Sequence, residues 1–130
     1  MNYDRRIYKL EKLAYHDSLT GLLNRSWLYE NKKNIKSKYV YFIDINNLRL
    51  INRGGHRKGD KYILDIVKSI KLNTNEILLR YAGDEFVLFS NNKNKLKLNN
   101  KYSFGMSVVS GGVMQSINNA DREMIKNKYE

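Results

Sequence analysis

Two apolar segments separated by a very short connection place the strongest constraint on how this chain can fold. Residues 77–81 and 86–90 have the aliphatic and aromatic content of buried strands, and only Ala82, Gly83, Asp84 and Glu85 lie between them. Two strands joined this tightly form a β-hairpin. The hairpin predicts a sheet that contains at least one antiparallel pair.

The segments around the hairpin predict helices and further strands. Apolar spacing predicts helices over residues 3–15, 26–37, 60–72 and 116–129, with Asn24 and Asp60 as N-caps of the second and third. Residues 38–44 and 102–109 are typical of strands, and a loop with Gly54, Gly55 and Gly59 follows the first of them. The order predicts an α+β fold, a mixed or antiparallel sheet with helices on one or both faces, similar to a ferredoxin-like palm.

Length and composition bound the class of protein. The chain has 130 residues, which fits one domain, and it has no cysteine, which excludes disulfides and cysteine-ligated metal sites. No apolar run is long enough for a membrane span, and the N-terminus lacks the apolar region of a signal peptide. We therefore expect a cytoplasmic protein.

The net charge of +11 leaves two interpretations open. A basic chain can bind nucleic acid, an anionic membrane or a polyphosphate ligand. The lysines are scattered, however, and Lys, Asn and Ile are all abundant, as in proteins of AT-rich genomes. Because no nucleic-acid recognition motif accompanies the charge, we do not expect nucleic acid as a partner.

The first predicted helix carries a short heptad seam. Tyr3, Ile7, Leu10 and Ala14 are spaced 4, 3 and 4 residues apart. The seam fits a dimerisation helix over residues 1–15 ahead of a catalytic domain over residues 16–130. It fits equally well a helix packed on its own domain.

Three carboxylates are expected to meet at one end of the sheet. Asp44 ends an apolar strand, and Asp84 and Glu85 lie at the tip of the hairpin that a palm-like sheet places beside that strand. Convergent carboxylates can hold Mg²⁺ together with substrate phosphates. On spacing alone, an ordinary polar turn is the favoured interpretation of the Asp-Glu pair.

Six sequence blocks resemble the GGDEF-domain diguanylate cyclases and occur in that family's order. They are residues 16–25 (HDSLTGLLNR), 42–52 (FIDINNLRLIN), 55–60 (GHRKGD), 80–86 (RYAGDEF), 103–106 (SFGM) and 120–128 (ADREMIKNK). The resemblance implies a compact palm-like nucleotidyl-cyclase domain with a variant AGDEF signature. It also implies second-messenger signalling through a cyclic dinucleotide that is made from two nucleoside triphosphates across a homodimer.

The resemblance assigns a role to particular residues. Asp44, Asp84 and the carbonyl of Ile45 would hold Mg²⁺ or Mn²⁺, and Glu85 would hold a second metal or help to deprotonate the 3′-hydroxyl. The remaining implied residues contact phosphates (Asn46, Asn47, Leu48, Arg49 and Lys128), read guanine (Asn52 and Asp60) or support the loops (Asn24, Arg25, His56, Arg80 and Gly83).

Several positions depart from the family pattern. Ala82 replaces the first glycine of the signature, Asn46 and Asn47 replace an acid and an aromatic residue, and the loop between Asn52 and His56 is one residue short. Residues 73–76 lack the RxxD inhibitory motif. Residues 91–101 are too few for the helix that the family places there.

The sequence therefore predicts an Mg²⁺-dependent cyclic-dinucleotide synthase, most simply one that converts two GTP into cyclic di-GMP. One alternative is a minimal CRISPR-polymerase-like cyclase of phage defence that uses ATP. The other is a catalytically retired GGDEF module that binds a nucleotide or a partner without turnover.

Overall fold

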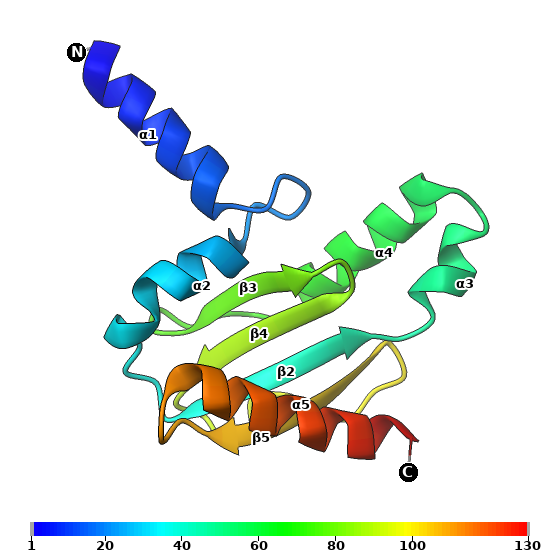
Figure 1. Ribbon diagram of the computed structural model, residues 1–130. Helices are drawn as coiled ribbons and strands as arrows, with labels where there is room; N and C mark the ends of the chain where they lie inside the picture. Colours follow the sequence, from blue (N-terminus) through cyan, green and yellow to red (C-terminus); the bar gives the residue numbers. More distant parts are fainter. Residues whose placement is uncertain (1, 130) are drawn as a thin grey trace.

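A single mixed sheet organises the molecule (Figure 1). The computed structural model describes the backbone of residues 2–129 and the side chains of residues 4–129. Five strands lie in the order β1-β3-β4-β2-β5, and only the β1–β3 pair is parallel. The strands are β1 (Leu23–Asn24), β2 (Tyr39–Ile45), β3 (Ile77–Ala82), β4 (Glu85–Ser90) and β5 (Tyr102–Val108). The predicted α+β palm-like fold, including the β3–β4 hairpin, is confirmed.

The register of the central strands places the end of β2 beside the hairpin tip. Asp44 of β2 lies opposite Glu85 of β4 on one side and Ser103 of β5 on the other. The backbone N–H of Ile45 donates to the carbonyl of Asp84 over 2.9 Å. These pairings bring residues from distant parts of the sequence to one end of the sheet.

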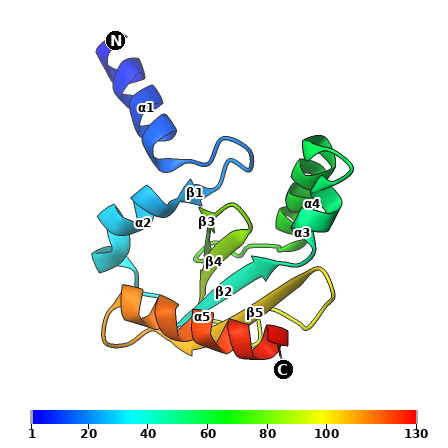
Figure 2. The ribbon, with the colours of Figure 1, turned by 45° about the vertical axis from the view of Figure 1, so that its right-hand side comes forward.

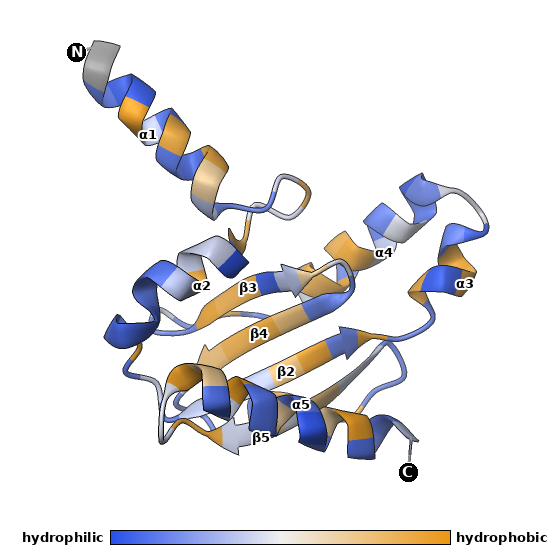
Figure 3. Cartoon of the chain, viewed as in Figure 1, coloured by the Kyte–Doolittle hydropathy of each residue, from blue (hydrophilic) through white to orange (hydrophobic). Residues whose placement is uncertain are grey.

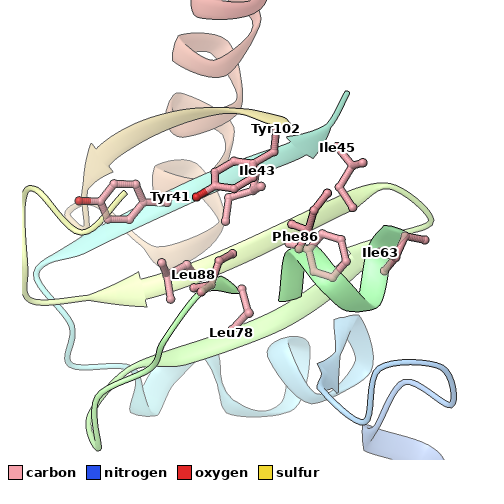
Figure 4. Close-up of a cluster of buried hydrophobic side chains, with 10 residues drawn as sticks. Tyr41, Ile43, Ile45, Ile63, Leu78, Phe86, Leu88 and Tyr102 are labelled. Atoms are coloured by element: carbon pink, nitrogen blue, oxygen red, sulfur yellow. The ribbon is translucent and has the colours of Figure 1, made fainter. Parts of the chain in front are cut away.

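Each face of the sheet buries its own hydrophobic cluster. On one face, Ile63 and Ile66 of helix α4 (His56–Ser69) belong to the same cluster as Ile43 and Phe86 of the strands (Figure 4). On the other face, helices α2 (Arg25–Asn31) and α5 (Val113–Tyr129) cover the sheet (Figures 1 and 2). A Cβ atom at Gly105 would lie 2.1 Å from the backbone nitrogen of Met124, so only glycine lets α5 lie this close to β5.

The predicted start of the third helix at Asp60 is wrong. Helix α4 begins at His56, and its N-cap is Gly55 with φ of +109°. Asp60 therefore lies inside the helix. Gly59, which the sequence analysis assigned to a loop, is buried in α4 because the side chain of Asn52 occupies the space where a Cβ would be.

Smaller differences concern helix boundaries. The segment after β2 contains a short helix α3 (Leu48–Asn52) where a loop was expected, and α2 continues as a 3₁₀ turn η1 (Lys32–Asn34). Helix α4 ends at Ser69, earlier than expected, and α5 begins at Val113, earlier than expected. As predicted, Asn24 caps α2, its side chain accepting from the N–H of Trp27 over 3.0 Å.

The N-terminal helix α1 (Asn2–Tyr15) extends away from the sheet and its covering helices (Figures 1 and 2). The side-chain amide of Asn24 donates to the carbonyl of Ala14 over 2.9 Å and ties the end of α1 to the domain. Residues 91–101 form no helix, as their number predicted. Within residues 2–129, none of the helices combines the length and the apolar character needed to cross a membrane.

Candidate active site

Four carboxylates lie around the C-terminal end of β2. Asp44 and Glu85 are register partners, and Asp84 lies exposed on the hairpin turn. Asp121 of α5 is close enough to oppose the ionisation of both Asp44 and Glu85. The sequence analysis predicted the first three of these acids at one end of the sheet and did not include Asp121.

Asp44 is largely buried, and only one of its carboxylate oxygens has a hydrogen-bond partner among the described residues. Its side chain is 17% exposed, and its Oδ2 accepts from Nζ of Lys128 over 3.1 Å. Its Oδ1 is buried and has no hydrogen-bond partner among the described residues. Burial raises the pKa of Asp44, and the neighbouring Asp84 and Asp121 raise it further, while the Lys128 ammonium opposes the shift.

Glu85 and Asp121 share this unfavourable environment. Burial raises the pKa of Glu85, and the carboxylates of Asp84, Asp44 and Asp121 add to the effect. Burial also raises the pKa of Asp121. Carboxylates that repel one another in this way favour a bound cation or a proton between them.

The donor chemistry fits a divalent cation only if ligands other than side chains contribute. In the part of the chain that the structure describes, no three His, Cys, Asp or Glu side chains lie close enough to hold a metal ion by themselves. The unpartnered Oδ1 of Asp44 and its acidic neighbours are the hard oxygen ligands that Mg²⁺ prefers. Mg²⁺ sites of this type take further oxygens from water and from substrate phosphates.

The predicted phosphate-contacting segment turns sharply away from β2. The N–H of Asn46 donates to the carbonyl of Lys101 over 2.9 Å, and its Oδ1 accepts from the Ser103 hydroxyl over 2.9 Å. The Asn46 amide is thus committed within the protein. Asn47 adopts a left-handed conformation with φ of +62° and starts α3, so Leu48 and Arg49 lie in the first turn of that helix.

The two predicted base-reading residues come together beside Gly59. The Oδ1 of Asn52 lies where a Cβ of residue 59 would be, at 1.7 Å from that ideal position. Asp60 is the next residue of α4 and is exposed. The shortened loop therefore keeps Asn52 and Asp60 near each other.

Arg80 holds the turn of the β3–β4 hairpin in place through its guanidinium. Its Nη2 donates to the carbonyl of Gly83 over 2.8 Å, and its Nη1 donates to both carboxylate oxygens of Asp17 over 3.2 Å. Asp17 also accepts from the backbone and hydroxyl of Thr20. These bonds lower the pKa of Asp17 against the opposing effect of burial.

Arg25 approaches the hairpin from α2. Its guanidinium lies 4.0 Å from the centre of the Tyr81 ring and donates to the hydroxyls of Tyr29 over 2.6 Å and Tyr81 over 3.0 Å. The guanidinium of Arg25 thus joins the start of α2 to the end of β3. His56, expected to order its loop, is the exposed first residue of α4.

Two residues that matter in this arrangement are absent from the predicted set. Asp17 orders the loop behind the hairpin, and its position inside the HDSLTGLLNR block was an available signal. Asp121 precedes Lys128 by seven residues, the spacing of one helix face. That spacing could have placed Asp121 beside Asp44 once Lys128 was assigned to the site.

Comparisons with curated proteins agree with this arrangement. The family profile described as "Diguanylate cyclase, GGDEF domain" matches residues 14–102. Diguanylate cyclase DgcP of Escherichia coli strain K12 is 39% identical over 95 residues, which cover 62% of this chain and 27% of DgcP. Cyclic di-GMP phosphodiesterase PdeB of Shewanella oneidensis is 36% identical over 88 residues, covering 62% of this chain and 10% of PdeB. The chain thus spans a minor part of these relatives.

Solved structures show the same architecture over nearly the whole chain. A microbial GGDEF domain studied with cyclic di-GMP has a TM-score of 0.74 at 25% identity, with 92% of this chain and 94% of that one covered. The coiled coil and GGDEF domain of DgcB from Caulobacter crescentus, in complex with cyclic di-GMP, has a TM-score of 0.76 at 17% identity, covering 98% and 87%. The second likeness establishes the fold alone. With the profile match covering more than half of its residues, the chain belongs to the GGDEF domain family.

Proposed function

We propose that this chain is a cyclic-dinucleotide synthase that depends on Mg²⁺ or Mn²⁺ and condenses two nucleoside triphosphates, most simply two GTP into cyclic di-GMP. The observation that carries the proposal is the half-satisfied Asp44 among Asp84, Glu85 and Asp121, in a member of the GGDEF family. Most buried polar atoms in proteins have a hydrogen-bond partner, so the unpartnered Oδ1 of Asp44 is a candidate ligand atom.

Metal binding falls to residues at the end of β2 and the hairpin tip. Asp44, Asp84 and the carbonyl of Ile45 are the proposed ligands, and Glu85 is the candidate either for a second ion or for the proton acceptor of the reaction. A bound Mg²⁺ supplies charge neutralisation for the triphosphate and orients it. Arg80 serves this site indirectly, because it holds the Gly83 carbonyl and so the turn that carries Asp84.

The proposed reaction is an in-line displacement. The 3′-hydroxyl oxygen of one nucleotide attacks the α-phosphorus of the other, a new P–O bond forms, and the bond to the β-phosphate oxygen breaks to release pyrophosphate. Glu85 is the proposed acceptor of the hydroxyl proton. Its raised pKa suits this task, since a general base works best when its pKa approaches the working pH.

Lys128 has to exchange partners during binding. Its ammonium lies 3.1 Å from Asp44 Oδ2, where it balances part of the clustered negative charge. A metal at Asp44 would take over this balancing role and free Lys128 for the triphosphate. Arg49 and the amides of Asn47 and Leu48 are the other proposed phosphate contacts, without the Asn46 amide, which is already paired.

Asn52 and Asp60 support guanine as the base. A carboxylate can accept from the ring N–H and the exocyclic amine of guanine together, whereas adenine N1 is itself an acceptor. The unpaired acceptors that adenine would create cost about 1–3 kcal/mol. We therefore expect GTP to be preferred over ATP as a substrate by about ten- to one-hundred-fold.

Catalysis of this kind needs two sites facing each other, so we propose a homodimer built through α1. The described members of the predicted seam, Ile7, Leu10 and Ala14, are exposed, while the side chain of Tyr3 lies outside the described residues. Tyr8 and Leu13 are also exposed, and the apolar patches of α1 are visible in Figure 3. A cytoplasmic location remains our prediction.

A retired module is the second candidate. Ala82, Asn46 and Asn47 depart from the family pattern at the nucleotide site, and some matching relatives carry names of cyclic di-GMP phosphodiesterases. A retired module would bind GTP or cyclic di-GMP without forming product. The retained carboxylate cluster favours the synthase.

One experiment separates these functions. The protein is incubated with Mg²⁺ and equimolar GTP and ATP, and the products are identified by mass. Cyclic di-GMP as the main product supports the proposal, whereas mostly adenine-containing product would support the phage-defence alternative. Bound but unconverted GTP would support the retired module.

The dimer requires a separate measurement. Product formed per enzyme molecule should rise with enzyme concentration and fall in Leu10→Asp, which puts a charge on the exposed face of α1. A rate strictly proportional to enzyme at dilutions where only monomer is present would contradict the dimer.

A further inference from the structure

A hollow opens on the face of the sheet that α4 covers, and one end of its lining, at Lys101 and Tyr102, adjoins the segment of Ile45 and Asn46. Its volume is about 480 Å³, and it lies between the C-terminal end of α4 and the loop over residues 95–102. Ile70 and Tyr102, both buried members of the core cluster, form part of its lining, and Leu96 packs against the same cluster. The hollow therefore has an apolar base that continues into the hydrophobic core.

Exposed leucines border this hollow. Leu98, which lines it, is 86% exposed, and Leu72, next to the lining residue Lys71, is 42% exposed. Apolar side chains gathered around a depression are typical of a surface that another molecule covers. Burying a leucine of this kind removes apolar surface from water and gives a partner a favourable contact.

The residues that line the hollow include several lysines and no aspartate or glutamate. Residues 86–120 contain no aspartate or glutamate, and Lys71, Lys95, Lys97 and Lys101 line the hollow. Lys95 is engaged with Glu76 over 2.7 Å and with the carbonyl of Lys71, so it holds the loop in place. Lys71, Lys97 and Lys101 are exposed and form no ion pair among the side chains of residues 4–129.

We propose that this hollow, lined by residues 69–71 and 95–102, is a docking site for an acidic amphipathic segment of a partner protein. Apolar side chains of the segment enter the hollow beside Leu98, and its carboxylates face Lys71, Lys97 and Lys101. Charge complementarity of this kind selects the partner and speeds its association. The proposal is independent of nucleotide chemistry at Asp44.

The lining argues against nucleic acid as the occupant. Its apolar surface comes from leucine and isoleucine, and the aromatic residue Tyr102 is only 9% exposed. Single-stranded nucleic acids bind to exposed aromatic faces on which bases stack. An aliphatic base within a lysine rim fits leucine side chains flanked by glutamates.

A designed peptide tests the proposal directly. The probe has about 15 residues, long enough for several helical turns, with leucines on one face and glutamates on the others. We expect it to shift the backbone amide NMR signals of residues 69–72 and 95–102 in the full chain. A matched peptide with lysines in place of the glutamates should produce no shifts.

Two variants and two controls locate the contact. Lys97→Glu with Lys101→Glu should weaken peptide binding by at least about tenfold, and Leu98→Ser by about tenfold. Lys33→Glu with Lys36→Glu, and Leu13→Ser, alter exposed residues elsewhere and should leave binding unchanged. Absence of binding at about 1 mM peptide would overturn the proposal. So would equal binding by the control pair, or tighter binding of duplex DNA that is indifferent to Leu98→Ser.

Discussion

Carboxylates lie beside lysines at both ends of the β3–β4 hairpin, but the two ends differ in how many hydrogen-bond and ion-pair partners the carboxylates have. At the open end, Glu76 accepts from Lys95 over 2.7 Å, from the Ser90 hydroxyl over 2.5 Å and from the N–H of Asn73 over 2.8 Å. Its side chain is 5% exposed. These bonds lower the pKa of Glu76 against the opposing effect of burial.

At the turn end, the carboxylates outnumber their partners. Asp44, Glu85 and Asp121 all have raised pKa values because of burial, and among the side chains of residues 4–129 Lys128 alone forms an ion pair with Asp44. One oxygen of Asp44 has no partner. Burial is common to both ends, so the number of hydrogen-bond donors is what distinguishes the two clusters, and the excess of carboxylates at the turn end is the basis for proposing a ligand there.

The largest expected effect is on catalysis at the turn end. Asp44→Asn keeps the size of the side chain but removes the charge, and we expect cyclic-dinucleotide formation to fall by at least about 100-fold while the protein stays folded. The same loss is expected for Asp84→Ala. Product is quantified by mass under saturating Mg²⁺, with Asp65→Asn on the exposed side of α4 as the control. A near-wild-type rate in either variant would refute the metal assignment.

The next effect concerns stability at the open end. Glu76→Gln removes one partner of a buried ion pair and leaves Lys95 uncompensated, so we expect a loss of about 2–4 kcal/mol in unfolding free energy. Denaturant unfolding measures this loss. Glu123→Gln breaks the exposed pair with Lys126, whose side chains are 49% and 60% exposed, and should change stability by less than about 0.5 kcal/mol. Equal effects of the two changes would mean that burial of Glu76 has no energetic consequence.

A third effect tests whether the turn end is held ready for a cation. Mg²⁺ at about ten times its dissociation constant should stabilise the chain by about 1.4 kcal/mol, seen as a rise in melting temperature. Chelation should reverse the rise, and Asp44→Asn should abolish it. Glu76→Gln should retain it, because Glu76 is at the other end of the hairpin. An equal rise in Asp44→Asn would place the ion elsewhere.

The hairpin and the strands β2 to β5 could be predicted because their signals are local, and their boundaries agree within a residue or so. The apolar runs and the short connection between residues 81 and 86 set the pairing. Strand β1 (Leu23–Asn24) was not predicted, because two residues are too few for a recognisable apolar pattern. The start of α4 could not be predicted, because glycine has a low helix propensity and Gly59 therefore indicated a loop. In the structure Gly59 lies inside the helix, where only a glycine leaves room for the side chain of Asn52. Asp60 then offered a false N-cap.

The partners of the site residues could not be predicted, because they depend on tertiary packing. Sequence placed Asp44, Asp84 and Glu85 at one end, yet nothing local shows that Lys128 lies on Asp44 or that Asp121 joins them. Both follow from how closely α5 packs on Gly105. The Glu76–Lys95–Ser90 cluster joins three segments of the chain and has no motif at all.

The smallest effect is the pH dependence of stability, and its sign distinguishes the two ends. A carboxyl whose folded pKa is raised costs stability as the pH rises from its unfolded pKa through its folded pKa. Glu85→Gln removes that cost, so at neutral pH the variant should be more stable than the wild type by less than about 1 kcal/mol. The difference should vanish in acid, where Glu85 is protonated in both states.

Glu76 should behave in the opposite sense. Its lowered pKa contributes stability that is present above the unfolded pKa and is lost as the pH falls through the folded pKa. The loss of unfolding free energy in Glu76→Gln should therefore be largest at neutral pH and become smaller as the pH is lowered. The increase in unfolding free energy in Glu85→Gln should become smaller over the same pH range. Unfolding free energies measured from about pH 3 to pH 7 give both curves. If both variants were destabilised at neutral pH, Glu85 would be a structural residue like Glu76, and its proposed role as proton acceptor would lose its physical basis.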